Sequence, residues 1–227
     1  RNPKIFNIHI QNPKIDLHNF DAIIAPEHDA LNGNNVYSSK GAIHYITESE
    51  IDREKTYLKK NINSEKVVSL ILGGPNKYYS FDQDQLINIF NVIKSTFLSK
   101  GFKVVVIPSM RTPKRSIELA IREMGSSGYV VKNVDKNAYL SAYALANYVV
   151  VTCDSTSMIS EAATSGKPIF VAHMKPKKNN YRFQKFFKLF REMGITRDLG
   201  EKVESWTYNK HNEAERIGSL IRNKIKN

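Results

Sequence analysis

Between residues 66 and 172, short apolar segments alternate with amphipathic ones, and this alternation limits the possible folds more than any other feature. Segments with the helical spacing of apolar residues separate the apolar runs. Strands that alternate with helices form right-handed βαβ units, so we predict an α/β fold with a Rossmann-like parallel sheet and helices on both faces. The predicted strands are 66–72, 103–107, 129–131, 148–153 and 169–172, and the predicted helices between them are 82–100, 112–125, 138–147 and 157–165.

Glycines and capping residues support these helix boundaries. Gly101 and Gly125 each follow a predicted helix, as is typical of helix ends. Asp82 with Gln85 three residues later predicts a capping box, and Thr112 followed by Pro113 predicts a capped helix start. Two further helices are expected at 183–193 and 212–226.

The first 60 residues differ from the rest in pattern. Short extended pieces are expected at 4–10, 21–25, 36–38 and 42–47, and a connecting helix at 48–60. We therefore expect residues 1–60 to hold the last strands of an N-terminal domain and a linker. Residues 61–208 are expected to form the Rossmann-like domain, and 209–227 a helix that packs back on the N-terminal part. Because the chain opens with Arg1, we expect upstream sequence to precede it.

Composition narrows the class of protein. The 227 residues are 41% hydrophobic and 25% charged, which argues against disorder. The apolar runs are too short to span a bilayer, no secretory signal is apparent, and a single cysteine fits a reducing compartment. We expect a cytoplasmic location, with a peripheral position on a membrane as the alternative. The net charge of +12 favours anionic partners, although AT-rich coding would also produce the widely scattered lysines. Nucleic acid ranks last among those partners, because only the charge points to it.

Ligands on parallel sheets bind beyond the carboxyl ends of the strands. That rule selects three loops: 73–77, 108–112 and 153–157. In the first, Gly73 and Gly74 allow close approach of backbone to a ligand, although a plain turn explains them equally well. In the second, the guanidinium of Arg111 stands at a strand end, flanked by Ser109 and Thr112, where it can bind a phosphate bidentately or lie free on the surface.

The third loop is the most specific. It combines Asp154, Ser155 and Ser157 with the predicted start of a helix, whose first amides and dipole attract anions. Glu161 follows one turn later, where a carboxylate can accept from ribose hydroxyls. Capping alone also explains the serines, and solvation alone explains Glu161. Cys153 is expected to be a buried small hydrophobe rather than a nucleophile.

Two other segments carry candidate chemistry. Glu27, His28 and Asp29 follow an apolar strand and are candidates for a general base, with an ordinary acidic turn as the alternative. No metal-site spacing such as HExxH or CxxC is present. Residues 181–190 mix aromatic and basic side chains, which suits an anionic surface or, alternatively, a helix that buries its phenylalanines.

Together these segments resemble the mitochondrial fission "elongated mitochondria" family of plant and bacterial proteins. The segments at 25–29, 73–75, 111–113, 151–168 and 204–208 occur in that order, and the resemblance covers nearly the whole chain. Bacterial members are often labelled nucleoside-diphosphate-sugar epimerases, but a Tyr-x-x-x-Lys pair and a dinucleotide fingerprint are both missing here. The family's C-terminal half is similar to the donor-binding half of GT-B glycosyltransferases.

The resemblance implies a GT-B-type C-terminal domain with a partial N-terminal domain, and a nucleotide-diphosphate sugar as donor ligand without a metal or other cofactor. It implies that the turn at 155–157 meets the diphosphate and that His28 or a neighbour faces the cleft. Two functions stay open: a glycosyltransferase-type activity, or a non-catalytic adaptor at an anionic membrane surface that recruits a dynamin-related protein. The nucleotide- and phosphate-binding residues that we expect are Gly73, Gly74, Ser109, Arg111, Thr112, Asp154, Ser155, Ser157, Met158 and Glu161.

Overall fold

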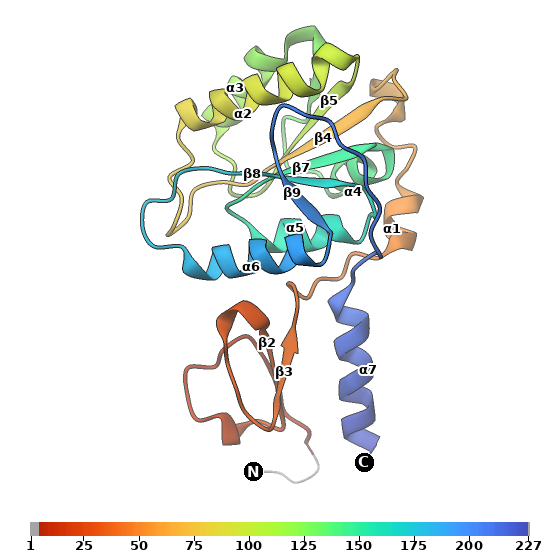
Figure 1. Ribbon diagram of the computed structural model, residues 1–227. Helices are drawn as coiled ribbons and strands as arrows, with labels where there is room; N and C mark the ends of the chain where they lie inside the picture. Colours follow the sequence, from red (N-terminus) through yellow and green to blue (C-terminus); the bar gives the residue numbers. More distant parts are fainter. Residues whose placement is uncertain (1–4, 227) are drawn as a thin grey trace.

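The computed structural model describes residues 5–226 and arranges them in two lobes, each built on a parallel sheet (Figure 1). The larger sheet has the order β6-β5-β4-β7-β8-β9 and the smaller sheet the order β1-β2-β3. The predicted α/β class with a Rossmann-like parallel sheet is confirmed. The strands of the larger sheet are β4 (Val67–Leu72), β5 (Lys103–Pro108), β6 (Gly128–Val130), β7 (Tyr148–Thr152), β8 (Ile169–Ala172) and β9 (Thr196–Asp198).

Helices cover both faces of the larger sheet, and its central strands are therefore near-continuous apolar runs. All six residues of β4 are buried. α2 (Gln83–Thr96) and α3 (Lys114–Met124) pack together on one face (Figure 1). On the opposite side lie α4 (Lys136–Leu145) and α5 (Thr156–Ala163), with α1 (Glu48–Arg53) against α4. α6 (Tyr181–Glu192) packs beside β9.

The direction of strand succession reverses between β4 and β7. The chain runs outward from β4 to β5 and β6, returns to β7 beside β4, and then runs outward the other way to β8 and β9. The helices after β4 and β7 leave toward opposite faces, so the strand order has a switch point between these two strands. Such a switch point is where open α/β sheets bind ligands.

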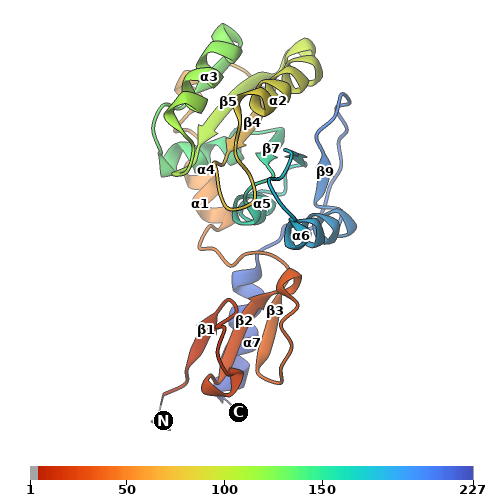
Figure 2. The same cartoon turned by 90° about the vertical axis from the view of Figure 1, so that its left-hand side faces the viewer.

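The smaller lobe contains β1 (Ile8–Ile10), β2 (Ala22–Pro26) and β3 (Val36–Ser39). α7 (Glu213–Lys226) lies alongside this sheet although it is the last element of the chain (Figure 2). Ile217 and Ile221 on α7 pack with Ala22 and Ile24 on β2. The chain thus crosses between the lobes twice, through residues 40–47 and 209–212.

The connecting helix predicted over 48–60 is much shorter than expected. Thr47 caps its start with a reciprocal capping box, but α1 ends at Arg53, and turns follow up to the 3₁₀ turn Lys59–Asn61. The buried Leu58 amide donates to the Ser141 hydroxyl at 3.0 Å, which draws the chain out of the helix and onto α4.

Other local expectations also need correction. No strand forms at 42–47, where the Ala42 amide donates to the Ser160 hydroxyl at 3.0 Å instead of joining a ladder. Asp82 caps no backbone amide because its carboxylate accepts from Ser80 and Gln85 side chains. The three-residue strand β9 was not predicted. None of the helices within residues 5–226 is both long and apolar enough to cross a membrane.

Candidate functional site

The loops after β4, β5 and β7 meet at the carboxyl edge of the larger sheet, and one side chain joins them. The Asp154 carboxylate is fully buried and accepts from the Gly74 amide at 2.9 Å, the Thr152 hydroxyl at 2.7 Å and Arg111 Nη2 at 2.9 Å. Burial raises the pKa of Asp154, and these donors oppose that rise. Asp154 was expected to contact a ligand; because its side chain is enclosed, it instead holds the loops together.

The two glycines of the first loop also serve packing. A Cβ at Gly73 would collide with the Asp154 carboxylate, and one at Gly74 would collide with the backbone carbonyl of Arg111. Because glycine has only a hydrogen atom in place of Cβ, the neighbouring loops can approach it this closely. The close approach that was expected between these glycines and a ligand is therefore made by the protein's own chain.

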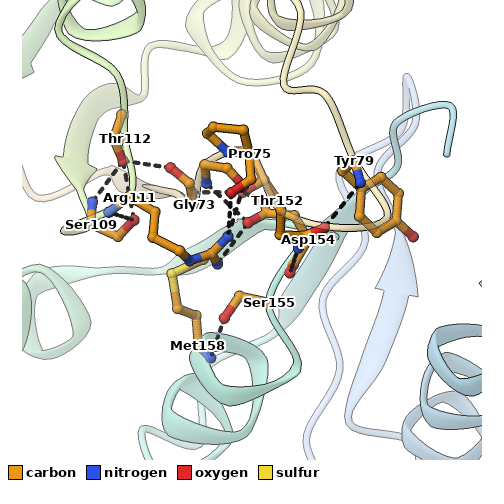
Figure 3. A network of polar contacts seen from close by, with 12 residues as sticks. Gly73, Pro75, Tyr79, Ser109, Arg111, Thr112, Thr152, Asp154, Ser155 and Met158 are labelled. Carbon is orange, nitrogen blue, oxygen red and sulfur yellow. Dashed lines mark hydrogen bonds and ion pairs between the residues drawn. The ribbon is translucent and has the colours of Figure 1, made fainter. Parts of the chain in front are cut away.

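The Arg111 side chain points toward the β4 loop and Asp154 (Figure 3). Its Nη1 donates to the Gly74 carbonyl at 2.7 Å, and its side chain remains 39% exposed. Part of the guanidinium is thus held in place while the rest remains accessible, which suits a positioned cation for an anionic ligand.

Thr112 does not cap α3, which begins at Lys114 after Pro113. The Thr112 hydroxyl instead accepts from the Ser109 amide at 2.8 Å and lies within donating distance of the Leu72 and Gly73 carbonyls. Thr112 therefore joins two loops rather than a ligand.

The start of α5 is the anion-attracting part of the edge. Ser155 is its N-cap, and its hydroxyl accepts from the Met158 amide at 3.4 Å, as expected for a cap (Figure 3). The first amides of a helix have no intrahelical acceptor, and the dipole is positive there. Ser155 and Met158 line one cavity, and Thr156 and Ser157 line a second.

The first of these, here called the strand-edge cavity, has a volume of about 320 Å³. It brings together three of the predicted site residues from two loops, namely Ser109, Arg111 and Ser155, with Met158 and Glu161 from α5. Its remaining lining is largely apolar or aromatic. The exposed side chains at its rim include Tyr45, Met110 and Val134.

Glu161 is not solvated on a helix face. Its Oε2 accepts from the Tyr139 hydroxyl at 2.5 Å, and that hydroxyl accepts from the Tyr143 hydroxyl at 2.6 Å. Burial raises the pKa of Glu161, and the Tyr139 hydrogen bond opposes the rise. A carboxylate in this setting is a strong acceptor for a ligand hydroxyl.

The second cavity, here called the interlobe cavity, has a volume of about 530 Å³ and is lined by both lobes. His28, Asp29 and Ser157 line it together with Arg182 of α6. Arg182 Nε donates to Asp29 Oδ1 at 2.7 Å, and burial lowers the pKa of His28. Glu27 is exposed and lines neither cavity, so the structure separates it from the other two predicted catalytic residues.

Sequence reasoning missed several lining residues. Lys136 and Tyr139 line the strand-edge cavity from the start of α4, and Asp135, the N-cap of α4, lines it as well. These residues follow β6, so the strand-end rule would have selected this fourth loop. Tyr45 reaches the same cavity from the interlobe crossing, and Lys136 Nζ lies 4.7 Å from its ring centre. Nothing local marks Tyr45 as a cavity residue.

Two alternatives are decided by burial. Cys153 is fully buried, and burial raises the pKa of its thiol to about 12, which agrees with the expected inert role. On α6, Phe186, Phe187 and Phe190 are buried in the core. These three phenylalanines therefore stabilise the fold, whereas Phe183 is half-buried and Tyr181 is exposed beside the basic side chains.

The family model described as Mitochondrial fission ELM1 matches residues 1–225. The chain is 26% identical to "Uncharacterized protein RP120" of Rickettsia prowazekii (strain Madrid E), over 96% of this chain and 73% of that protein. It is 24% identical to "Mitochondrial fission protein ELM1" of Arabidopsis thaliana, over 97% of this chain and 58% of that protein.

Solved structures share the fold at low sequence identity. UDP-GlcNAc 2-epimerase from Methanocaldococcus jannaschii, in complex with UDP-GlcNAc and UDP, matches with a TM-score of 0.52 and 14% identity over 91% of this chain and 62% of that chain. The enzyme from Neisseria meningitidis, bound to UDP-GlcNAc, matches with a TM-score of 0.51 and 14% identity over 89% and 54%. The predicted GT-B-type fold is thereby confirmed, and the chain spans less than two thirds of these solved chains.

Proposed function

The chain belongs to the mitochondrial fission ELM1 family, and on that premise we propose that it binds a nucleoside diphosphate sugar at the carboxyl edge of its larger sheet. One observation carries the proposal: a cationic group, a helix N-terminus and a half-buried carboxylate border one cavity at the carboxyl edge of the sheet. Solved proteins of the same fold hold UDP-GlcNAc or UDP, which supports uridine nucleotides as the first ligands to test.

Each part of the ligand has a matching environment. The nucleoside occupies the strand-edge cavity, where Glu161 accepts from ribose hydroxyls and the apolar rim covers the base. The diphosphate lies over the first turn of α5 and next to Arg111. The sugar then points past Thr156 and Ser157 into the interlobe cavity, toward His28 and Arg182.

The reaction that fits this arrangement is glycosyl transfer. The bond from the anomeric carbon to the diphosphate oxygen breaks, an acceptor oxygen bonds to that carbon, and the acceptor's proton passes to His28. Burial lowers the pKa of His28, so its imidazole is neutral and able to accept a proton at neutral pH. Arg111 and the α5 amides stabilise the negative charge of the departing diphosphate.

The test is calorimetry and thermal unfolding with UDP-, GDP-, ADP- and CMP-sugars. A ligand at about 100 times its Kd stabilises the folded state by about 2.7 kcal/mol, which raises the Tm by roughly 5–10 °C for a chain of this size. Arg111→Lys and Glu161→Gln should each weaken binding about tenfold or more, because one removes the guanidinium fork and the other the anionic acceptor.

Arg115→Lys and Glu118→Gln on the exposed side of α3 are matched controls and should bind as the wild type does. Absence of stabilisation by all four nucleotide-sugar classes would refute the proposal. Equal losses in the controls and in the site variants would show that the contacts are not those proposed.

A second candidate, the membrane adaptor, is favoured by the basic surface of α6. Lys188 is exposed on that helix, and the exposed Lys175, Lys177 and Lys178 precede it. Co-sedimentation with vesicles that contain phosphatidylserine, compared with neutral vesicles, tests this function. Binding that is lost in Lys185→Glu/Lys188→Glu supports it, and equal binding to both vesicle types or none contradicts it.

A further inference from the structure

Two tyrosines on α4 adjoin Glu161, the buried Tyr143 and the half-buried Tyr139, and neither belongs to a predicted motif. The ring centres of Tyr139 and Tyr143 are 4.8 Å apart, and their hydroxyls are joined by a hydrogen bond of 2.6 Å. The Tyr139 hydroxyl in turn lies 2.5 Å from Glu161 Oε2. Three residues from two helices thus form one chain of polar atoms that ends at the strand-edge cavity.

The direction of the protons in this chain follows from counting donors. Each phenol has one proton, and an ionised carboxylate only accepts. Tyr143 donates to Tyr139, so the Tyr139 proton is directed to Glu161. Burial raises the pKa of both tyrosines well above their ordinary value, so both stay protonated at any pH at which the protein would work.

The hydrogen bond from Tyr139 engages only one of the two carboxylate oxygens of Glu161. Within residues 5–226, Glu161 Oε1 accepts no hydrogen bond, while Glu161 lines the strand-edge cavity. A carboxylate held through one oxygen keeps its rotamer and offers the other oxygen in a fixed place. The natural partner of such an acceptor is a hydroxyl group rather than a phosphate, which the negative charge would repel.

We propose that Tyr139, oriented by Tyr143, is a positioning residue that fixes Glu161 to accept from a ribose hydroxyl, so that the site takes ribonucleotides and requires Glu161 to be ionised. This inference rests on the proposed nucleotide site and specifies how that site selects its ligand. It assigns to α4 a part in ligand recognition that does not depend on Tyr139 touching the sugar hydroxyl itself.

A pH dependence follows. Burial raises the pKa of Glu161, and the Tyr139 proton lowers it, so removing that proton raises the pKa further. Binding that needs the carboxylate is lost as the pH falls through this pKa, and Tyr139→Phe therefore moves the midpoint of the loss upward. The other titratable or charged groups around this cavity and the adjoining turn of α5 are Arg111, Asp135, Lys136, Tyr45 and His44.

The experiment measures UDP affinity from pH 4 to 8 by calorimetry in wild type, Tyr139→Phe, Tyr143→Phe and Tyr208→Phe. The midpoint should rise by about one pH unit in Tyr139→Phe, the equivalent of one lost hydrogen bond to a charged group, and by less in Tyr143→Phe. Tyr208→Phe is the matched control, because its buried hydroxyl donates to the Lys167 carbonyl at 2.9 Å and should leave the midpoint unchanged.

Two further measurements separate positioning from a merely structural role. The ligand 2′,3′-dideoxyUDP lacks both ribose hydroxyls, so it should bind wild type and Tyr139→Phe equally. Carbon NMR of the labelled Glu161 carboxyl should show the same upward shift of its pKa in Tyr139→Phe without any ligand.

The outcomes are distinct. UDP binding with the same midpoint in wild type and Tyr139→Phe overturns this inference and leaves the proposed function standing. Equal affinity of the wild type for UDP and 2′,3′-dideoxyUDP also overturns it. A wild-type protein that binds none of the nucleotide sugars refutes the proposed function and the ribonucleotide preference together, and the NMR titration then decides whether Tyr139 positions Glu161.

Discussion

Glu213 at the start of α7 ties the two ends of the smaller lobe together, and its replacement offers the sharpest test of how the lobes are held. Its side chain is 2% exposed. Its carboxylate accepts from the Lys40 amide at 2.8 Å and from Arg216 Nε at 2.9 Å and Nη2 at 2.6 Å. Arg216 also donates to the Ser38 carbonyl at 2.7 Å, so one acid joins the end of β3, the first crossing and α7.

The expected magnitude follows from these contacts. Burial pushes the pKa of Glu213 up, but the hydrogen bonds from Arg216 and the Lys40 amide outweigh it, so the pKa lies below its ordinary value. Glu213→Gln keeps one acceptor oxygen but replaces the other with an NH2 group that faces a donor. We expect this change to lower the free energy of unfolding by about 2 kcal/mol. Glu213→Ala leaves Arg216 and the Lys40 amide without their acceptor and should cost about 3–5 kcal/mol.

The loss of stability in Glu213→Gln should depend on pH. A depressed carboxyl pKa contributes stability that is present above the unfolded pKa, near 4.5, and is lost as the pH falls through the lower folded pKa. The difference between wild type and Glu213→Gln should therefore be full at pH 7 and shrink below pH 4.5.

The assay is urea unfolding at several pH values, with hydrogen exchange of α7 amides as a local probe. Glu215→Gln on the exposed side of the same helix is the control and should stay within about 0.5 kcal/mol of wild type. A Glu213→Gln protein as stable as that control at pH 7, or a penalty that persists in acid, would refute the reasoning.

Three further predictions concern packing and ionisation. Gly74→Ala should destabilise the fold by several kcal/mol and weaken UDP-sugar binding, because the added Cβ collides with the Arg111 carbonyl. Gly200→Ala is the control: its added Cβ meets no other atom, so the variant should unfold at the wild-type temperature. Cys153 should react with a thiol reagent only as fast as the protein unfolds, because it is fully buried and burial raises its pKa to about 12; rapid labelling of folded protein would contradict this. Burial lowers the pKa of His28, His44 and His211, so the unfolded state binds more protons than the folded state below about pH 6.5. The Tm should therefore fall from pH 7 to pH 5, and it should fall less steeply in His44→Gln. A Tm that does not change with pH would exclude this cause.

Much of the larger lobe follows from short-range patterns. The predicted strand 169–172 coincides with β8, and the other four predicted strands agree with the structure to within about a residue at each end. Gly101 and Gly125 adopt positive φ at helix ends, as the sequence indicates. Helix starts were harder to predict, because Asp82 and Thr112 have competing partners from neighbouring loops that no local signal reveals.

For the candidate site, the sequence identified the edge of the sheet at which the three loops meet but could not assign every role. Ser109, Arg111, Ser155, Met158 and Glu161 line the strand-edge cavity, and Ser157 lines the interlobe cavity. Gly73, Gly74, Thr112 and Asp154 lie behind it and hold the loops. A polar residue at a strand end has the same local signature whether it faces a ligand or a neighbouring loop.

The sequence alone determined the parallel α/β class, the positions of most elements and the edge of the sheet at which the polar loops meet. The reason is that hydrophobic periodicity, glycine and capping residues act over only a few positions of the chain. The tertiary structure alone decided the strand order, the switch point between β4 and β7, and the partners of buried groups. The Arg111–Asp154 pair spans 43 residues and the Tyr139–Glu161 contact spans 22. Such contacts depend on how separate elements pack, which local periodicity does not encode.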